Sequence, residues 1–144
     1  MDISTAHAAA RLEACRVPAL QASLALLASS TSDRARLVFY GGTKPAAGAA
    51  ATGALATVNL SQRAGLVDAS AKTLALDTPQ EGQVDGADPA TGTAATWARI
   101  FTPGGNWWAD LTVSDATGDG EIRLSSVLLL QGGFVRVTNA VVAG

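Results

Sequence analysis

The residues best spaced for chemistry lie in one acidic turn, Asp115–Gly120, whose sequence is DATGDG. Carboxylates at alternate positions followed by glycine form the first half of a calcium-binding loop. The twelfth position, which needs a bidentate glutamate, is Ser126, and helices do not flank the turn. Glu121 could still join Asp115 and Asp119 around an ion. The sequence favours a simpler interpretation, a hairpin turn that uses Asp and Gly for left-handed backbone conformations.

The single histidine and the single cysteine leave little room for nucleophilic catalysis. A Ser–His or Cys–His pair would have to use His7, whose neighbours are alanines, so we expect a solvated helix residue. Cys15 shares a helical stripe with Ala8 and Leu12, so we expect a small buried hydrophobe. One cysteine excludes a disulfide framework, and no Cys/His cluster exists for zinc. We therefore expect no catalytic residue, no metal site and no cofactor, in a protein that is not an enzyme.

Composition and charge exclude further classes. The 144-residue chain carries a net charge of -2, and only 15% of its residues are charged. A nucleic-acid binder needs a basic patch, which this sequence lacks, and no apolar stretch has the length of a membrane span. We therefore expect neither nucleic acid nor a membrane as partner. The hydrophobic residues, 48% of the chain, are mostly small, which suits close packing of sheets and subunits.

Large aromatic side chains on outer strand faces are the best candidates for contact with a partner. Alternation along Trp107–Val113 puts Trp107 on the core face and Trp108 on the polar face. On the last predicted strand, Phe134 shares a mostly polar face with Arg136. We therefore predict that Trp107 is buried and that Trp108, Phe134 and Arg136 lie in a partner interface. The alternative is that loops or the N-terminal helices cover these aromatics.

The first 30 residues have a helical pattern. An alanine-rich helix is expected over Ser4–Arg16, and Pro18 predicts the start of a second helix, because proline is tolerated at a first helical position. In that second helix, Leu20, Leu24 and Leu27 recur at helical spacing and form an apolar stripe. We count these three leucines among the predicted interface residues.

An export signal is the alternative for this segment. Arg11 and Arg16 precede an apolar run, as they would in a signal peptide. Gln21 and Ser23 interrupt that run, and the charged region before it is unusually long. The sequence therefore favours an amphipathic helix.

After Asp33 the pattern changes to short strands separated by Gly- and Pro-rich turns. Seven or eight such strands are typical of a β-sandwich, a jelly roll or a barrel. We expect an all-β fold, a sandwich or jelly roll over residues 34–144, with a short helical segment over residues 1–33. The expected strands are Ala35–Tyr40, Gly53–Leu60, Lys72–Leu76, Ala94–Phe101, Asn106–Val113, Glu121–Leu124, Val127–Leu130 and Phe134–Val142.

Two regions between these strands carry separate predictions. The Thr-Pro-Gly-Gly sequence after Phe101 predicts that the strands on either side form a β-hairpin. Within that hairpin, Trp97 could face either side of the sheet. Glu81–Ala90 is rich in turn residues, so no strand is predicted there.

The order of motifs resembles a family of small structural proteins from tailed bacteriophages and prophages. A strand ending in an aromatic residue, Leu37–Tyr40, leads into Gly-Thr-Lys-Pro at residues 42–45. The strand Gly53–Leu60 follows, then Thr91–Arg99 and a final Gly-Gly strand, Gly132–Thr138. The motifs rest mainly on Gly, Ala and Thr, and the resemblance covers most of the chain.

The resemblance implies a virion structural protein, most of all a capsid cement or decoration protein. Such a protein binds the outside of the major capsid protein lattice and stabilises the head, where many weak contacts act together. It implies a homo-oligomer, a dimer or trimer, in a phage head assembled in the bacterial cytoplasm. The N-terminal helical segment or a strand edge could dock on the lattice.

Three alternatives to the cement protein stay open. The first is a head–tail connector or a tail component. The second is the carbohydrate-binding domain of a fibre or spike, which would need Trp107 and Trp108 as a shared platform although alternation puts them on opposite faces. The third is an enzyme that uses the acidic turn.

Overall fold

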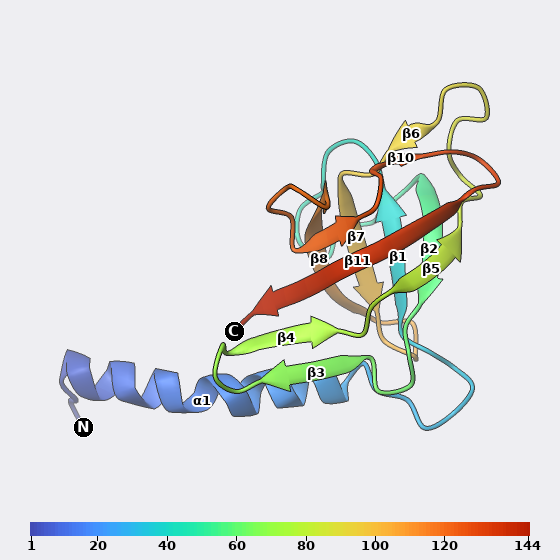
Figure 1. The fold of residues 1–144 in the computed structure, drawn as a ribbon. Helices are drawn as coiled ribbons and strands as arrows, with labels where there is room; N and C mark the ends of the chain where they lie inside the picture. The colour runs from blue at the N-terminus through green and yellow to red at the C-terminus, as the bar shows by residue number, and fades with distance from the viewer.

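A computed structural model describes all residues, 1–144, as one helix followed by eleven strands (Figure 1). The helix, α1, spans Thr5–Ala25, and no helix is long and apolar enough to serve as a membrane span. The strands are β1 (Arg36–Tyr40), β2 (Ala54–Asn59), β3 (Gly65–Asp68), β4 (Thr73–Leu76), β5 (Gln80–Gln83), β6 (Thr93–Ala94), β7 (Trp97–Phe101), β8 (Trp107–Asp115), β9 (Ile122–Leu124), β10 (Leu128–Leu129) and β11 (Phe134–Ala143).

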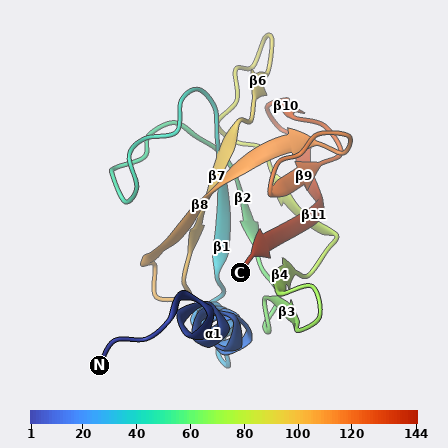
Figure 2. The ribbon, with the colours of Figure 1, turned by 90° about the vertical axis from the view of Figure 1, so that its left-hand side faces the viewer.

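Nine strands form one sheet in the order β2–β1–β7–β8–β9–β11–β4–β3, and β5 also pairs with β11. Just after β5, Val84 bridges to Ala56 of β2. The amides of Asp85 and Gly86 both donate to the carbonyl oxygen of Leu55, at 3.1 and 3.0 Å. The chain after β5 therefore returns to the β2 edge, and the sheet curls into a half-barrel (Figure 2).

Two glycines permit this return. A Cβ atom at Gly82 would overlap the carbonyl oxygen of Thr57, and one at Gly86 would overlap that of Ala54. Only glycine lets the backbone approach a neighbouring strand this closely. The polar, glycine-containing segment around β5 thus closes the curl of the sheet without any large side chain of its own.

Apolar side chains on the inner face of the curled sheet form the core. Phe39, Ile100 and Leu124 are among the side chains that are completely buried there. From the N-terminal segment, Leu20 and Leu27 join the same core. Burying a side chain of this size contributes about 1.5–3 kcal/mol, so the two leucines anchor the end of the helix on the sheet.

The structure corrects the prediction of two helices, because α1 runs without a break through Pro18. Its start was predicted correctly: Ser4 caps the helix, and its Oγ accepts a hydrogen bond from the backbone N–H of His7 at 3.2 Å. Proline inside a helix removes one backbone hydrogen bond and crowds the carbonyl group four residues before it, which costs about 3 kcal/mol or more. The packing of Leu20 and Leu27 holds the following turns in line with those before Pro18.

Most of the first half of α1 extends past the β3–β4 hairpin (Figure 1). Every residue from Ser4 to Arg16 is exposed, and Leu12 leaves 66% of its surface open. Cys15 is exposed too, so its predicted burial was wrong. The helical face that carries Cys15 is exposed to solvent, because α1 packs on the sheet mainly through residues that follow Cys15. Glu13 alone reaches the domain in this half, through an ion pair with Lys72 in the β3–β4 turn.

The strand predictions were largely correct after Asp33. Each predicted strand overlaps an observed one, although β8 and β11 run past their predicted C-terminal ends. β7 and β8 pair as the expected hairpin, closed by a hydrogen bond from Thr102 N to Asn106 O at 2.9 Å. Ala94 does not extend β7 but belongs to β6, which pairs with β10 in a separate two-stranded sheet. Two short strands were missed, β3 and β5.

The all-β class with one N-terminal helix is therefore confirmed, with eleven short strands rather than seven or eight. The main sheet is a curled half-barrel. The finer assignment to a sandwich or jelly roll is not confirmed by this topology.

Candidate functional site

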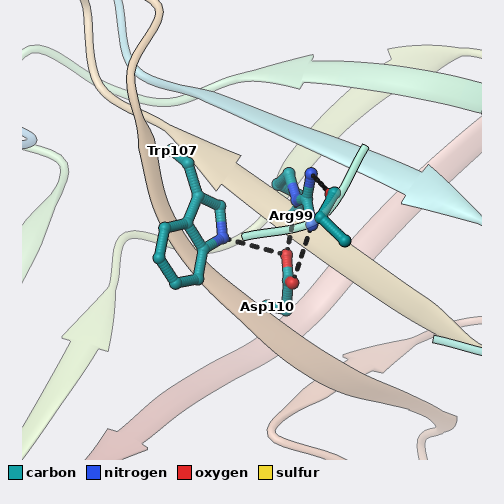
Figure 3. Close-up of polar contacts among 4 residues, drawn as sticks. Arg99, Trp107 and Asp110 are labelled. Atoms are coloured by element: carbon teal, nitrogen blue, oxygen red, sulfur yellow. Dashed lines mark hydrogen bonds and ion pairs between the residues drawn. The ribbon is translucent and has the colours of Figure 1, made fainter. Parts of the chain in front are cut away.

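A buried ion pair lies at the centre of the β7–β8 hairpin (Figure 3). The strand register places Arg99 directly opposite Asp110. Arg99 Nε donates to Asp110 Oδ1 at 2.6 Å, and one Nη donates to Oδ2 at 2.8 Å. The two side chains are only 6% and 5% exposed. This fork-to-fork geometry is the strongest form of an arginine–carboxylate contact, and it orients both groups.

The pair also holds the loop between β1 and β2. The second Nη of Arg99 donates to the carbonyl oxygen of Ala49 in that loop at 2.7 Å. Trp107 Nε1 donates to Asp110 Oδ1 at 3.2 Å (Figure 3). Gly48 lies against the six-membered ring of the same indole, with φ at +74°, a conformation that favours glycine. Loop, indole and ion pair are therefore one connected unit on the outer face of the sheet.

Beside this unit is a small aromatic cluster. The rings of Tyr40 and Trp97 stack at 4.4 Å between centroids and 14° between planes. With Val38 they form a second, outer core that is separate from the main one. The guanidinium of Arg99 lies 5.6 Å from the Trp97 ring, within range of a cation–π contact. Trp97, whose side was left open by the sequence, is buried here, and its Nε1 has no hydrogen-bond partner.

The ion pair sets the charge state of the site. Hydrogen bonds from Arg99 hold the pKa of Asp110 below its ordinary value of 3.8, and they outweigh burial, which acts in the opposite direction. The indole N–H of Trp107 and the charge of Lys44 lower this pKa further. Burial raises the pKa of the Tyr40 hydroxyl. Asp110 is therefore an anion and Tyr40 a neutral phenol at neutral pH.

A cavity of about 310 Å³ opens next to the ion pair. Its walls come from the loop after β1 and from the start of β8. Trp108 contributes one wall and is held by a hydrogen bond from its Nε1 to the carbonyl oxygen of Ser23, at 3.1 Å. The complete lining is Lys44, Pro45, Ala47, Trp107, Trp108, Ala109 and Asp110.

The structure reverses the predicted roles of the two tryptophans. Trp107, predicted to be buried, is 46% exposed, whereas Trp108, predicted on the outer face, is partly buried and packs against the main core. The cause is a β-bulge: Phe101 pairs with Trp107 and Ile100 with Ala109, so Trp108 is the extra residue. The bulge breaks the alternation, and both indoles line the same cavity.

The other predicted interface residues have separate positions. Leu20 and Leu27 are buried in the chain's own core and Leu24 packs against it, so these leucines are not available to a partner in this structure. The sheet covers the apolar stripe that these leucines form. Phe134 is 71% exposed, and Arg136 is exposed and ion-paired with Glu81 of β5 at 3.7 Å. These two remain candidates for a contact surface.

The acidic turn does not gather its carboxylates. Asp115 Oδ1 accepts hydrogen bonds from the N–H of Thr117 and of Gly118, both at 3.0 Å, and from the Thr117 hydroxyl at 2.8 Å. Glu121 Oε2 accepts from the N–H of Thr112 at 2.9 Å. These bonds hold one oxygen of Asp115 within the loop and one oxygen of Glu121 against β8. No group of three or more His, Cys, Asp or Glu side chains in the chain could hold a metal.

The hairpin interpretation of this turn was also wrong. β8 and β9 pair in parallel, and the loop between them folds back along β8. Gly118 and Gly120 are not left-handed but allow a close approach: their Cβ atoms would lie 2.5 Å from Ser114 Cβ and 2.6 Å from Ser114 N. His7, the other candidate, is an exposed helix residue.

The Arg99–Asp110 pair is the feature that sequence analysis missed. The predicted hairpin and its turn would place Arg99 opposite Ala109. Only the bulge at Trp108 shifts the register by one residue, so that Arg99 faces Asp110 and the two charges interact across the sheet. Comparison of the chain with known protein families, with curated proteins and with solved structures found no match.

Proposed function

We propose that this chain is a bacteriophage virion structural protein, a capsid cement or decoration protein that binds the outside of the major capsid protein lattice and stabilises the head. The proposal rests on the motif resemblance and on one structural observation, the exposed first half of α1. We infer a homo-oligomer, a dimer or trimer, without catalytic activity and without nucleic acid or membrane as partner.

The exposed half of α1 supports this function for a physical reason. A helical segment of three turns has little stability in water unless something packs on it. From Ser4 to Leu12 no side chain is hydrogen-bonded or ion-paired to the domain. A capsid surface would supply the missing contacts, and a lattice with many equivalent sites needs only weak binding at each of them. The half-barrel then serves as a rigid base for the exposed half of α1.

Copy number in purified phage particles tests the proposal. We expect quantitative mass spectrometry to find the chain in numbers that scale with the major capsid protein. A small, fixed copy number would instead assign it to the head–tail connector or tail. Absence from intact particles would overturn the virion proposal altogether.

A truncated variant tests the exposed half of α1. Deleting residues 1–12 leaves every buried side chain in place. We expect this variant to melt within a few degrees of the full chain and to bind capsids more weakly. The variant Leu12→Asn keeps the helix and removes the one large apolar side chain of its exposed half. It therefore tests whether Leu12 itself contacts the capsid.

A second candidate, the carbohydrate-binding domain of a fibre or spike, is favoured by the β-bulge in β8. The sequence pattern counted against it, because alternation separated Trp107 from Trp108. In the structure both indoles line one cavity, which restores the shared aromatic surface that sugar binding needs.

A further inference from the structure

The cavity beside the Arg99–Asp110 pair has the composition of a small-ligand site. Its volume of about 310 Å³ is at the lower end of the range for such sites, and four of its seven lining residues are hydrophobic. A few polar groups converge on an apolar surface, as they do where a ligand is oriented as well as buried. The ligand must therefore be small, with both an apolar face and polar groups.

The two indoles offer only carbon surface to such a ligand. Trp107 Nε1 is used by Asp110, and Trp108 Nε1 is used by the carbonyl oxygen of Ser23. Neither N–H is free to recognise a ligand, and both hydrogen bonds fix the planes of the rings. A rigid pair of aromatic rings suits the flat C–H face of a pyranose sugar, which is apolar in the middle and polar around its rim.

The charges of the site favour an anionic group on that ligand. The charge of Asp110 is matched by Arg99, which contacts both carboxylate oxygens. Lys44 is exposed on the cavity wall and forms no ion pair. The site as a whole is therefore positive by one unit, from a flexible ammonium group that can reach a bound anion.

We propose that this cavity binds a pyranose that carries a carboxylate, such as a hexuronate. The sugar ring lies against Trp107 and Trp108, its carboxylate contacts the Lys44 ammonium, and a ring hydroxyl donates to Asp110. The carboxylate of Asp110 accepts three hydrogen bonds within the chain, which leaves about one acceptor position for a ligand. This proposal rests on the second candidate function, sugar binding at this cavity, and is independent of the capsid role, because none of the cavity residues belongs to the exposed half of α1.

Indole N–H signals provide the direct test. The full chain, labelled with ¹⁵N, is titrated with sodium glucuronate, glucose and benzoate. We expect glucuronate to shift the signals of Trp107 and Trp108 saturably, with a Kd on the order of 1 mM, and to leave the buried Trp97 signal in place. Glucose should bind about two- to fivefold more weakly, because it lacks the charge that Lys44 contacts. Absence of a saturable shift overturns the proposal, as does tighter binding of benzoate, which would indicate an aromatic acid instead.

Two variants with matched controls exclude indirect effects. Ala47→Phe fills the cavity from an exposed loop position and should abolish binding, whereas Ala50→Phe, on the same loop outside the cavity, should not. Lys44→Met should reduce glucuronate binding to the level of glucose, and Lys72→Met should leave it unchanged. Binding that survives Ala47→Phe places the sugar elsewhere and contradicts the assigned site.

Discussion

Arg99 and Asp110 face each other across the β7–β8 hairpin and form an ion pair that is almost completely buried. The same guanidinium holds the carbonyl oxygen of Ala49, so one side chain ties two strands to the long loop after β1. Taking two charges out of water is costly, and such a pair stabilises a fold only when the remaining hydrogen bonds are satisfied. Here the Ala49 carbonyl and the Trp107 indole supply two of them.

Removing one partner of this pair should therefore destabilise the chain strongly. We expect Arg99→Met to lower the free energy of unfolding by about 3–5 kcal/mol, because it leaves the Asp110 carboxylate buried without a cation. The double variant Arg99→Met/Asp110→Leu should recover part of that loss. Urea denaturation of both variants measures the difference, and equal losses would show that the charge of Asp110 is not the cause.

Stability should fall in acid, because several carboxyl groups, Asp110 and Asp77 among them, have a lowered pKa in the folded chain. Hydrogen bonds from Arg63 lower the pKa of Asp77, as those from Arg99 lower the pKa of Asp110. A carboxyl group with a lowered folded-state pKa contributes its full stabilisation above the ordinary value of 3.8 and loses it as the pH falls through the lower, folded-state value. We expect melting temperatures to drop below about pH 4.

The variant Asp77→Asn separates the contribution of Asp77 to the pH dependence of stability from that of Asp110. It should be less stable than the wild type at pH 7, and its stability should depend less steeply on pH in acid. An acid transition as steep as that of the wild type would assign the pH dependence to other groups.

The tryptophan pair gives a test of the bulge. Trp108→Ala should cost about 2–4 kcal/mol, because it removes a ring packed on the core and the hydrogen bond to Ser23. Trp107→Ala removes a half-exposed ring and should cost about 1 kcal/mol. Thermal melts of both variants are sufficient, and the reverse order would restore the strict alternation that the sequence suggested.

The two halves of the N-terminal segment should also differ. Leu27→Ala creates a cavity at a completely buried position and should cost about 2–5 kcal/mol. Leu12→Ala, on the exposed half of α1, should change stability by less than about 0.5 kcal/mol. Chemical denaturation measures the free energy of unfolding of both variants. A large effect of Leu12→Ala in the isolated chain would mean that the exposed half of α1 packs on the domain in solution.

Local patterns predicted most of the fold, and the failures share a physical cause. The strand Ala35–Tyr40 is apolar and bounded by glycines, so its type follows from composition alone. In contrast, β5 is polar and is a strand because it pairs with β11, while Gly82 lets its backbone approach β2 closely. This strand depends on contacts with segments that are distant in the sequence, and the residues next to β5 carry no sign of them.

The candidate site was hidden for the same reason. Alternation assigns faces correctly along a regular strand, but one extra residue at Trp108 reverses the assignment for its neighbour. Pro18 led to a similar error. The local rule predicts a helix boundary at proline, whereas the burial of Leu20 and Leu27 stabilises one continuous helix. In each case packing between distant segments decided the outcome.

Phe134 gives the sharpest test of the capsid proposal, because it is a large aromatic side chain with 71% of its surface exposed. Phe134→Ala removes no buried contact, so the melting temperature should be unchanged. If this side chain contacts the capsid lattice, the variant should bind capsids about five- to thirtyfold more weakly, which corresponds to about 1–2 kcal/mol. Leu66→Ala, at another exposed apolar position on β3, is the matched control and should bind normally. Equal capsid binding by the wild type and Phe134→Ala would remove this face from the interface and leave α1 as its main element.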